Sequence, residues 1–300
     1  MVVILGPTAS GKTSLAVKLA YDFNGEIISA DSRQVYKGMD IGTGKDLKDY
    51  EYKDKVIQYH LIDIINPDTD YSVYKFKLDY KKALENIIRK DKQPFLCGGT
   101  GLYIESILLN YHIADVAPDL SLRNKLESYN LSELITLLKS KFNNQFNPDY
   151  HNSKRRVIRS LEILFNNNSD ILKMNINNNS SKDILVIGIK IDRYENLKLI
   201  KNRLLSRLND GMVEEVENLI NNGLSINRLN YFGLEYKFIG KYLNNELSYD
   251  DMVEKLNIAI NQFSKRQMTF FRRMEKRGID IKWIEINNYN QAYSLTKLHF

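Results

Sequence analysis

The sequence predicts an α/β fold, in which helices flank a parallel β-sheet and an all-helical insertion interrupts the chain. Short apolar runs alternate with amphipathic stretches in the first third of the 300 residues, a rhythm typical of parallel strands joined by helices. Polar clusters directly follow several of these runs, at the end of a parallel sheet where ligands bind. From about residue 114 to 183, helical patterns succeed one another without a convincing strand.

The first third of the chain is predicted to contain four strands and two helices. The strands are short and mostly apolar: Val2–Leu5, Glu26–Ser29, Leu61–Ile64 and Pro94–Cys97. Amphipathic periodicity predicts helices over Ser14–Phe23 and Ser72–Arg89. Because the carboxyl ends of parallel strands meet at one edge, we expect three polar clusters to lie together there. They are Gly6–Thr13, Asp31–Gln34 and Gly98–Tyr103.

The rest of the chain is predicted to hold the insertion and the second part of the core. The insertion, 114–183, carries helical patterns over Leu120–Tyr129, Leu131–Phe142 and Arg155–Phe165, and we expect it to act as a lid or clamp. The core comprises residues 1–113 and 184–300. Its second part is predicted to contain a returning strand, three helices and a last short strand: Ile184–Ile191, Tyr194–Asp210, Val213–Asn221, Tyr249–Lys276 and Ile281–Ile286.

The composition, with 43% hydrophobic and 27% charged residues, is ordinary for a soluble globular protein. No apolar run approaches the roughly 20 residues of a membrane span, so we expect no membrane partner. The single cysteine, Cys97, excludes an intramolecular disulfide framework and favours a cytoplasmic location. We expect a monomer. The formal charge of +6 favours polyanionic partners, but it fits a solvated lysine-rich surface equally well.

GPTASGKT, Gly6–Thr13, matches the phosphate-binding pattern G-x-x-x-x-G-K-[ST] between a predicted strand and a predicted helix. Its glycines let backbone N–H groups point at phosphate oxygens, Lys12 adds positive charge, and the Thr13 hydroxyl can reach Mg²⁺. The motif therefore predicts a P-loop NTPase-like core, but it does not define the reaction. The candidate phosphate-binding residues are Gly6, Thr8, Ala9, Ser10, Gly11, Lys12, Thr13 and Ser14.

Two further clusters carry polar side chains suited to catalysis. Asp31, at the end of the second predicted strand, fits a general base or a magnesium ligand, and it equally fits a helix cap or turn residue. The donors and acceptors of 32–34, Ser32, Arg33 and Gln34, suit a polar ligand such as a base edge. Thr100 stands in a second glycine-rich turn, which either grips a diphosphate or forms a tight corner.

The long predicted helix near the carboxyl end has an apolar stripe with one polar member, Gln267. The stripe comprises Val253, Leu256, Ile260, Phe263, Gln267, Phe270 and Met274. A buried amide must find partners, so Gln267 either pairs with backbone or faces a pocket. The basic residues beside the stripe form either a solvated helix end or a contact surface for nucleic acid. They are Lys265, Arg266, Arg272, Arg273, Lys276 and Arg277.

Two pairs of arginines have no role that their spacing can assign. Arg203 and Arg207 stand one turn apart in the helix 194–210, and Arg156 and Arg159 stand at i and i+3 in the insertion. One member of each pair can face phosphates while the other is surface charge.

Together these segments resemble the tRNA dimethylallyltransferase (isopentenyltransferase) family over most of the chain. The matching segments are GPTASGKT (6–13), DSRQVYKGMDIGTGK (31–45), HLIDI (60–64), GGTGLYI (98–104), RVIRSLE (156–162) and SKRQMTFFR (264–272). The resemblance implies transfer of a dimethylallyl group from its diphosphate to N6 of adenosine 37, 3′ of the anticodon. The products are N6-(dimethylallyl)adenosine and diphosphate. It also implies that the P-loop holds dimethylallyl diphosphate and Mg²⁺ rather than ATP.

The resemblance implies a role for each candidate residue. Asp31 matches the general base, and Thr100 and Arg203 match positions at the diphosphate leaving group. Arg203 is preferred to Arg207 because it lies eight residues before Gly211, as in the family. The positions implied on the adenine and tRNA side are Ser32, Arg33, Gln34, Arg156, Arg159, Lys265, Gln267 and Arg272.

The chain departs from the family pattern at Gly44, Asp46 and Ser153, and by an apparent insertion of Leu234-Glu235. Three alternatives stay open: an adenylate dimethylallyltransferase that acts on AMP, ADP or ATP, a P-loop kinase, and a non-enzymatic RNA-binding protein. The segments 31–34 and 265–272 argue against a kinase, which does not need them. The basic helix and the insertion argue against a free-nucleotide acceptor, because they suit a large polyanion.

Overall fold

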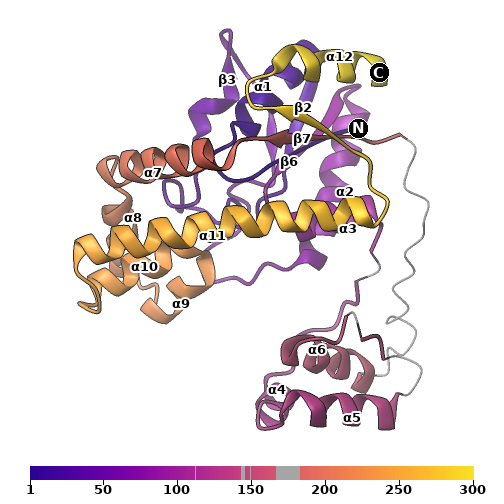
Figure 1. Ribbon diagram of the computed structural model, residues 1–300, viewed down its shortest axis with the longest axis vertical. Coiled ribbons are helices and arrows are strands. Elements are labelled where there is room, and N and C mark those ends of the chain that lie inside the picture. Colours follow the sequence, from indigo (N-terminus) through magenta and orange to yellow (C-terminus); the bar gives the residue numbers. More distant parts are fainter. Residues whose placement is uncertain (112, 143–145, 149, 167–182) are drawn as a thin grey trace. The chain divides into compact units, whose positions relative to one another are not determined.

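A parallel six-stranded sheet forms the centre of the computed structural model, which describes residues 1–111, 113–142, 146–148, 150–166 and 183–300 (Figure 1). The strand order is β5-β2-β6-β1-β7-β8. The bounds are β1 Val2–Leu5, β2 Gly25–Ser29, β5 Tyr59–His60, β6 Gln93–Gly98, β7 Leu185–Lys190 and β8 Ile281–Glu285. Neighbouring strands pair in parallel throughout, which confirms the α/β fold that the sequence predicts.

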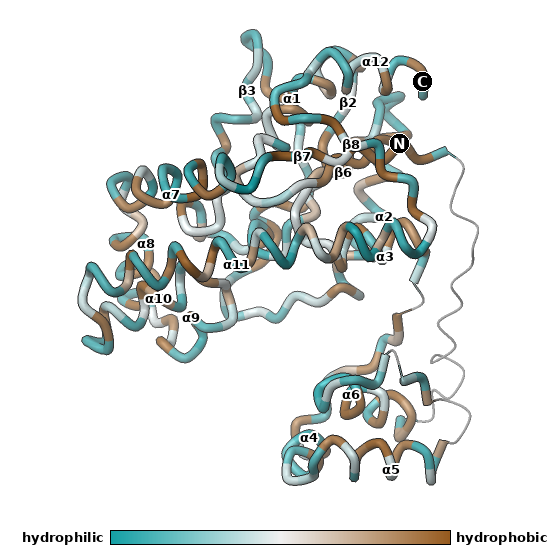
Figure 2. Tube along the Cα trace, viewed as in Figure 1, coloured by the Kyte–Doolittle hydropathy of each residue, from teal (hydrophilic) through white to brown (hydrophobic). Residues whose placement is uncertain are grey.

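The central strands are apolar because helices cover both faces of the sheet. All four residues of β1 are buried, and the strands show as a hydrophobic band in Figure 2. Alternate residues such as Val2 and Ile4 share one core with α1 (Lys12–Asp22) and with Ala292 of α12 (Tyr289–His299). Helices α2 (Val73–Arg89), α3 (Gly101–Leu108) and α11 (Tyr249–Lys276) lie on the other side of the sheet (Figure 1).

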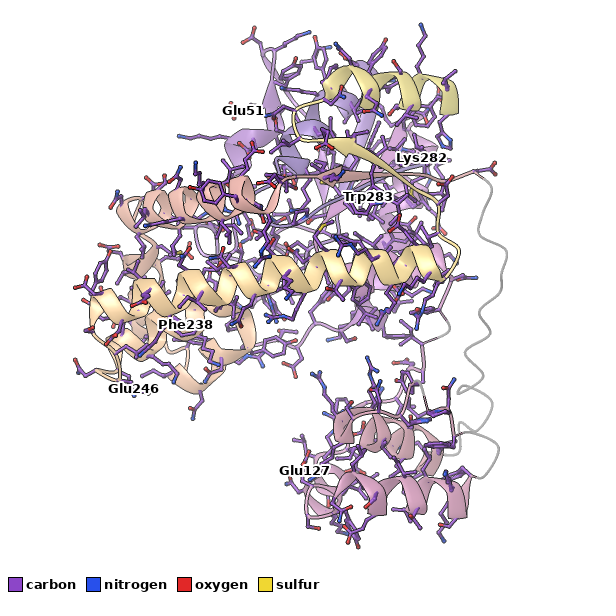
Figure 3. The ribbon with its side chains drawn as sticks, viewed as in Figure 1. Glu51, Glu127, Phe238, Glu246, Lys282 and Trp283 are labelled. Carbon is purple, nitrogen blue, oxygen red and sulfur yellow. The ribbon has the colours of Figure 1, made fainter. Side chains whose placement is uncertain are left out.

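The other helices after β7 and a small hairpin between β2 and β5 complete the part of the chain around the sheet. Helix α7 follows β7 and leads through three shorter helices into α11. Their bounds are α7 Arg193–Asn209, α8 Met212–Asn221, α9 Ile226–Phe232 and α10 Leu234–Leu243. A short 3₁₀ helix and a small antiparallel hairpin lie between β2 and β5: η1 Leu47–Tyr50, β3 Glu51–Tyr52 and β4 Lys55–Val56. Trp283 of β8, labelled in Figure 3, donates its indole N–H to Glu275 of α11 at 2.7 Å.

The structure divides into two compact units, Met1–Leu108 with Asn179–Phe300, and Leu109–Asn178. The second unit contains α4 (Leu120–Leu126), α5 (Leu131–Lys141) and α6 (Lys154–Phe165), packed on their own apolar core. Ser153 stands at the N-cap of α6 without a side-chain capping bond. Residues 143–145, 149 and 167–182 of the predicted insertion lie outside the described residues.

Two expectations about the elements were wrong. The predicted strand Leu61–Ile64 is a loop, and β5 comprises only the two residues before it. Leu61 and Asp63 have φ of 63° and 54°, a left-handed conformation that cannot continue a strand. The buried face of α11 also differs from the predicted stripe, since Ser264 is buried whereas Phe263 is 40% exposed. This long helix packs on α7, α10 and α3 in turn, so no single straight stripe is covered along its length.

Among the described helices, none has both the length and the apolar character that crossing a lipid bilayer demands.

Candidate active site

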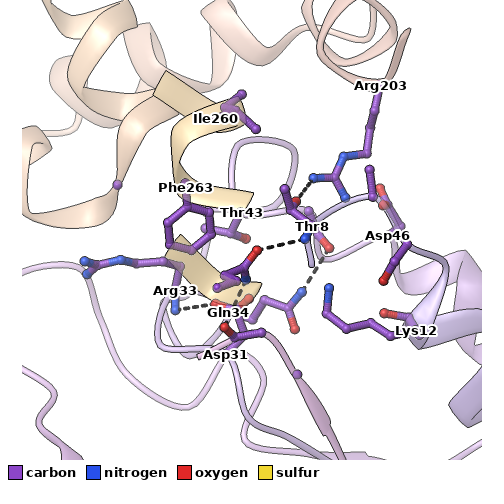
Figure 4. A pocket seen from close by; sticks show the side chains of 18 of the residues that line it. Thr8, Lys12, Asp31, Arg33, Gln34, Thr43, Asp46, Arg203, Ile260 and Phe263 are labelled. Atoms are coloured by element: carbon purple, nitrogen blue, oxygen red, sulfur yellow. Dashed lines mark hydrogen bonds between the residues drawn. The ribbon is translucent and has the colours of Figure 1, made fainter. Parts of the chain in front are cut away.

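The three predicted polar clusters line one pocket of about 900 Å³ at the carboxyl edge of the sheet (Figure 4). The P-loop contributes Thr8–Ser14, the loop after β2 contributes Asp31–Gln34, and the turn after β6 contributes Gly98–Gly101. Helices α7 and α11 complete the wall with Arg203 and Gln267, among others. Parallel strand ends therefore bring together residues that lie far apart in the sequence.

The P-loop folds as an anion cradle because its backbone takes conformations that expose N–H groups. Ala9 and Gly11 have φ of 62° and 73°, and α1 begins directly afterwards at Lys12. Gly6 leaves no room for a side chain, since a Cβ there would lie 2.8 Å from Ser10 Oγ. The Ser10 hydroxyl is buried and has no hydrogen-bond partner among the described residues.

Lys12 holds its ammonium group at this cradle and donates a hydrogen bond of 3.1 Å to the Pro7 carbonyl. Burial away from water, with a smaller contribution from the nearby Arg203, lowers its pKa to about 8, while Cys97 opposes the shift. An ammonium that has lost water and lacks an adjacent carboxylate partner gains from a bound anion. The P-loop is therefore prepared for negatively charged oxygens.

Thr8 is the point at which α7 and α11 hold the P-loop. Its N–H donates to Gln267 Oε1 at 2.8 Å, its carbonyl accepts from Asn196 Nδ2 at 3.0 Å, and its hydroxyl accepts from Arg203. Ser264 of α11 donates to Asn196 Oδ1 at 2.6 Å and so fixes the orientation of that amide. Asn196 and Ser264 were missed in the sequence, where only their polarity on otherwise apolar helix faces could have marked them.

Gln267 joins the two glycine-rich loops. While its oxygen accepts from Thr8, its Nε2 donates to the Gly99 carbonyl at 2.9 Å. The space is tight, because a Cβ on Gly99 would lie 2.4 Å from that nitrogen. The polar member of the stripe thus pairs with backbone, one of the two arrangements expected for a buried amide, and it also lies on the pocket wall.

Asp31 and Thr100 both line the pocket, and a hydrogen bond links their loops. Asp31 Oδ1 accepts from the Arg33 N–H at 2.8 Å, a turn that leaves the second carboxylate oxygen for another partner. Thr100 Oγ1 accepts from the Ser32 N–H at 3.0 Å. These two bonds fix the loop that carries Asp31.

Hydrogen bonds and a cation–π contact fix two neighbours of Asp31, Gln34 and Arg33. Gln34 accepts from the Ser29 hydroxyl at 2.9 Å and donates to the Gly44 carbonyl at 3.0 Å. The Arg33 guanidinium lies 5.2 Å from the centre of the Tyr231 ring, a cation–π distance. These contacts fix the orientations of two side chains that line the pocket.

Arg203 and Arg207 both line the pocket, but their surroundings differ. Burial lowers the pKa of Arg203 to about 10, helped by the neighbouring charge of Arg207. Arg207 is paired with Asp46 at 3.0 Å. Glu235, from the apparent insertion at the start of α10, also lines the pocket, and burial raises its pKa.

Part of the pocket wall is apolar. Leu199, Leu234, Ile260, Phe263 and Phe270 contribute to it, and Ile260 and Phe263 are labelled in Figure 4. A ligand with a charged end and a small hydrocarbon end therefore suits this pocket better than a wholly polar one.

Other sequence candidates stand outside this pocket. Lys265 and Arg272 are exposed on α11, whereas Arg273 and Arg277 bond to the buried Glu105 of α3 at 2.8 and 3.0 Å. The basic end of α11 is therefore divided between structural ion pairs and an exposed surface.

Arg156 and Arg159 belong to the second unit. Arg159 pairs with the buried Glu162 at 2.9 Å, and Arg156 donates to Asn152 at 2.9 Å.

The geometry has a counterpart in known families. Residues 34–274 match the model of the family described as IPP transferase, and residues 1–59 match that of isopentenyl transferase. The chain belongs to the IPP transferase family. A tRNA dimethylallyltransferase 1 of Azobacteroides pseudotrichonymphae is 48% identical over 100% of this chain and 98% of its own length. That of Porphyromonas gingivalis is 45% identical over 95% and 93%.

Solved structures agree with this IPP transferase membership. A tRNA isopentenylpyrophosphate transferase of Staphylococcus epidermidis is 32% identical, with a TM-score of 0.68 over 99% of this chain and 96% of its own. The enzyme of Bacillus halodurans is 29% identical, with a TM-score of 0.69 over 99% and 93%. A eukaryotic dimethylallyltransferase acting on tRNA shares the fold at a TM-score of 0.78 and 23% identity, over 99% and 76%.

The donor set of this IPP transferase fits Mg²⁺ only together with a phosphate ligand. No group of three or more His, Cys, Asp or Glu side chains within the described ranges could hold a metal ion. The Thr13 hydroxyl and the Asp31 carboxylate do line the pocket. Since Mg²⁺ keeps several waters and takes phosphate oxygens readily, Thr13 is the protein group suited to an ion that arrives with a diphosphate.

Proposed function

We propose that this chain is a tRNA dimethylallyltransferase that transfers a dimethylallyl group from dimethylallyl diphosphate to N6 of the adenosine 3′ of the anticodon. One observation carries the proposal. A P-loop with a desolvated lysine, an apolar wall and a carboxylate at the end of β2 share one pocket. This combination supplies a site for the diphosphate, a site for the hydrocarbon and a base for the acceptor.

Lys12, Arg203 and the P-loop amides bind the diphosphate and stabilise the negative charge that grows on it as the allylic C–O bond breaks. Thr13 is the residue that would hold Mg²⁺, which adds positive charge to the leaving diphosphate when bound. Thr8 places Arg203 at the loop, because the guanidinium donates to its hydroxyl. Thr100 lines the same pocket, and we assign it to the leaving-group end.

Asp31 acts as the general base. The attacking N6 amine must lose a proton as the new C–N bond forms, and the second carboxylate oxygen of Asp31 can accept it. Ser32, Arg33 and Gln34 line the mouth beside it and orient the adenine. The target adenosine has to leave its stack to reach this depth, at a cost of a few kcal/mol.

Contacts along the tRNA offset that cost. Lys265 and Arg272 present exposed positive charge on α11. Arg156 and Arg159 are half-buried in the second unit, which we propose clamps the anticodon arm. Gln267 lines the pocket and contributes through the loops that it joins. We further propose that the enzyme works as a cytoplasmic monomer.

The test is an acceptor comparison. Labelled dimethylallyl diphosphate and Mg²⁺ are incubated with the protein and either a tRNA transcript carrying the adenosine, the same transcript with guanosine there, or AMP. Label is expected on the first tRNA alone. Label on AMP but not on tRNA would favour an adenylate dimethylallyltransferase and contradict the proposal. ATP consumption without prenyl transfer would indicate a P-loop kinase, and binding of tRNA with neither reaction would indicate a non-enzymatic RNA-binding protein.

A further inference from the structure

Arg207 and Asp46 form an ion pair across the pocket wall. Arg207 Nη2 donates to Asp46 Oδ2 at 3.0 Å, joining α7 to the loop that precedes η1. The side chain of Arg207 is 10% exposed, whereas that of Asp46 is 53% exposed. Both residues line the pocket.

Gly44 provides the space that the Arg207 guanidinium occupies. A Cβ at Gly44 would lie 2.2 Å from Nη2 of Arg207, so a larger residue there would displace the guanidinium. Gly44 also has φ of 68°, which favours glycine. Gly44 and Asp46, the two departures from the family pattern in this loop, therefore meet the same arginine.

The same loop connects the Arg207–Asp46 pair to Gln34, which we assign to the adenine side of the pocket. The Gly44 carbonyl accepts a hydrogen bond of 3.0 Å from Gln34 Nε2, while Gln34 Oε1 accepts from Ser29 at 2.9 Å. Gln34 lies three residues after Asp31 on the same loop. Movement of the Gly44 carbonyl would therefore turn the Gln34 amide.

The loop also has anchors that do not involve Arg207. Glu215 of α8 accepts from the N–H groups of Asp40, Ile41 and Gly42 at 2.7, 2.7 and 3.0 Å. The fully buried Lys45 side chain is paired with Asp40 at 2.8 Å. Because Glu215 and Lys45 hold the loop independently of Arg207, loss of the Arg207–Asp46 pair should leave the loop folded and alter it only locally, at Gly44 and Asp46.

We propose that Arg207 is a positioning residue for the acceptor: it binds Asp46, fixes the Gly44 carbonyl and thereby orients Gln34 toward the adenine. Its charge is committed to Asp46, whereas Arg203 and Lys12 bond to Thr8 and Pro7 of the P-loop. This inference rests on the proposed function, because it assigns Gln34 to the adenine side.

Steady-state kinetics of single and double variants test it. Asp46→Asn and Arg207→Gln should each raise KM for tRNA, or lower kcat, by about tenfold. KM for dimethylallyl diphosphate should change less than about twofold, because neither residue holds the donor. The double variant should be no worse than either single one, since both break the same pair. Asp210→Asn, which removes an exposed carboxylate from the C-terminal end of α7, is the matched control.

Gly44→Ala tests the same arrangement independently, because the added methyl group would displace the Arg207 guanidinium. It should reproduce the tRNA defect in the unaltered protein and add little in the Arg207→Gln background. Circular dichroism and melting curves establish that each variant is folded.

A rise in donor KM for Arg207→Gln, with a fall for Asp46→Asn, would make Arg207 a diphosphate ligand and overturn the inference. Additive defects in the double variant would also overturn it. Absence of prenyl transfer by the unaltered protein would instead contradict the proposed function, so the two failures are distinguishable.

Discussion

The side-chain oxygen of Gln267, in α11, accepts a hydrogen bond of 2.8 Å from the backbone N–H of Thr8, 259 residues away in the sequence. The same amide donates to the Gly99 carbonyl. One buried side chain therefore sets the distance between the two glycine-rich loops that line the pocket.

Gln267→Leu should weaken donor binding, because it leaves the Thr8 N–H and the Gly99 carbonyl without their partner. Such a loss costs about 1–3 kcal/mol, so KM for dimethylallyl diphosphate should rise about tenfold or more. Gln262→Leu, at an exposed position of the same helix, is the control. If Gln267→Leu alters only tRNA affinity, the amide contacts the tRNA and does not set the loop spacing.

Asp31→Asn should lower kcat by about 10²–10⁴-fold, because an amide cannot accept the N6 proton. The asparagine oxygen can still accept from the Arg33 N–H, so the loop should keep its conformation. Single-turnover rates measure the effect, and filter binding should show unchanged tRNA affinity. Asp250→Asn, exposed in the first turn of α11, serves as the control. Normal turnover of the Asp31 variant would make this carboxylate a turn residue alone.

The affinity for dimethylallyl diphosphate should fall as pH rises through the pKa of Lys12, about 8 in the unliganded protein. Burial has lowered this pKa, so the ammonium is charged below about 8 and loses its proton above it. The dissociation constant should be constant below about pH 7.5 and rise by up to about tenfold per unit above 8. Arg203, with a pKa of about 10, stays charged over most of this range. Lys12→Met should bind weakly at every pH, and a flat profile for the unaltered protein would contradict the assignment.

Charge reversal at Lys265 or Arg272 should weaken tRNA binding without changing the melting temperature. Both side chains are exposed on α11. Each phosphate contact that is lost should reduce the slope of log K against log salt by about one. An unchanged slope in both variants would mean that this helix surface is only solvated.

Arg273→Gln should behave differently, because Arg273 pairs with the buried Glu105 at 2.8 Å. Glu105 keeps Arg277, so we expect a loss of about 1–3 kcal/mol in the free energy of unfolding rather than a larger one. Chemical denaturation measures it. Full stability together with weaker tRNA binding would place Arg273 on the tRNA surface instead.

The features of the site that could be predicted from the sequence are those that depend on a local sequence pattern. The P-loop and Asp31 were found because each follows a strand, and the ends of parallel strands meet at one edge. The stripe on α11 marked Gln267 as a buried amide, but its partners are backbone groups that carry no sequence signal.

Other features depend on distant partners or on backbone conformation. Leu61–Ile64 has strand-like composition, yet Leu61 adopts a left-handed φ that composition does not reveal. Arg203 and Arg207 have equivalent spacing, and only the space above Gly44 and the position of Asp46 separate their roles. Asn196 and Ser264 matter only because α7 and α11 pack side by side at Thr8.

The central claim is that the P-loop holds the diphosphate of the transferred group rather than ATP. A single-turnover experiment with excess enzyme, tRNA, Mg²⁺ and dimethylallyl diphosphate, in the absence of ATP, tests it directly. We predict one diphosphate released for each dimethylallyl group that appears on tRNA, with ATP acting only as a weak competitor. A requirement for ATP, or release of phosphate from it in step with the reaction, would contradict the account.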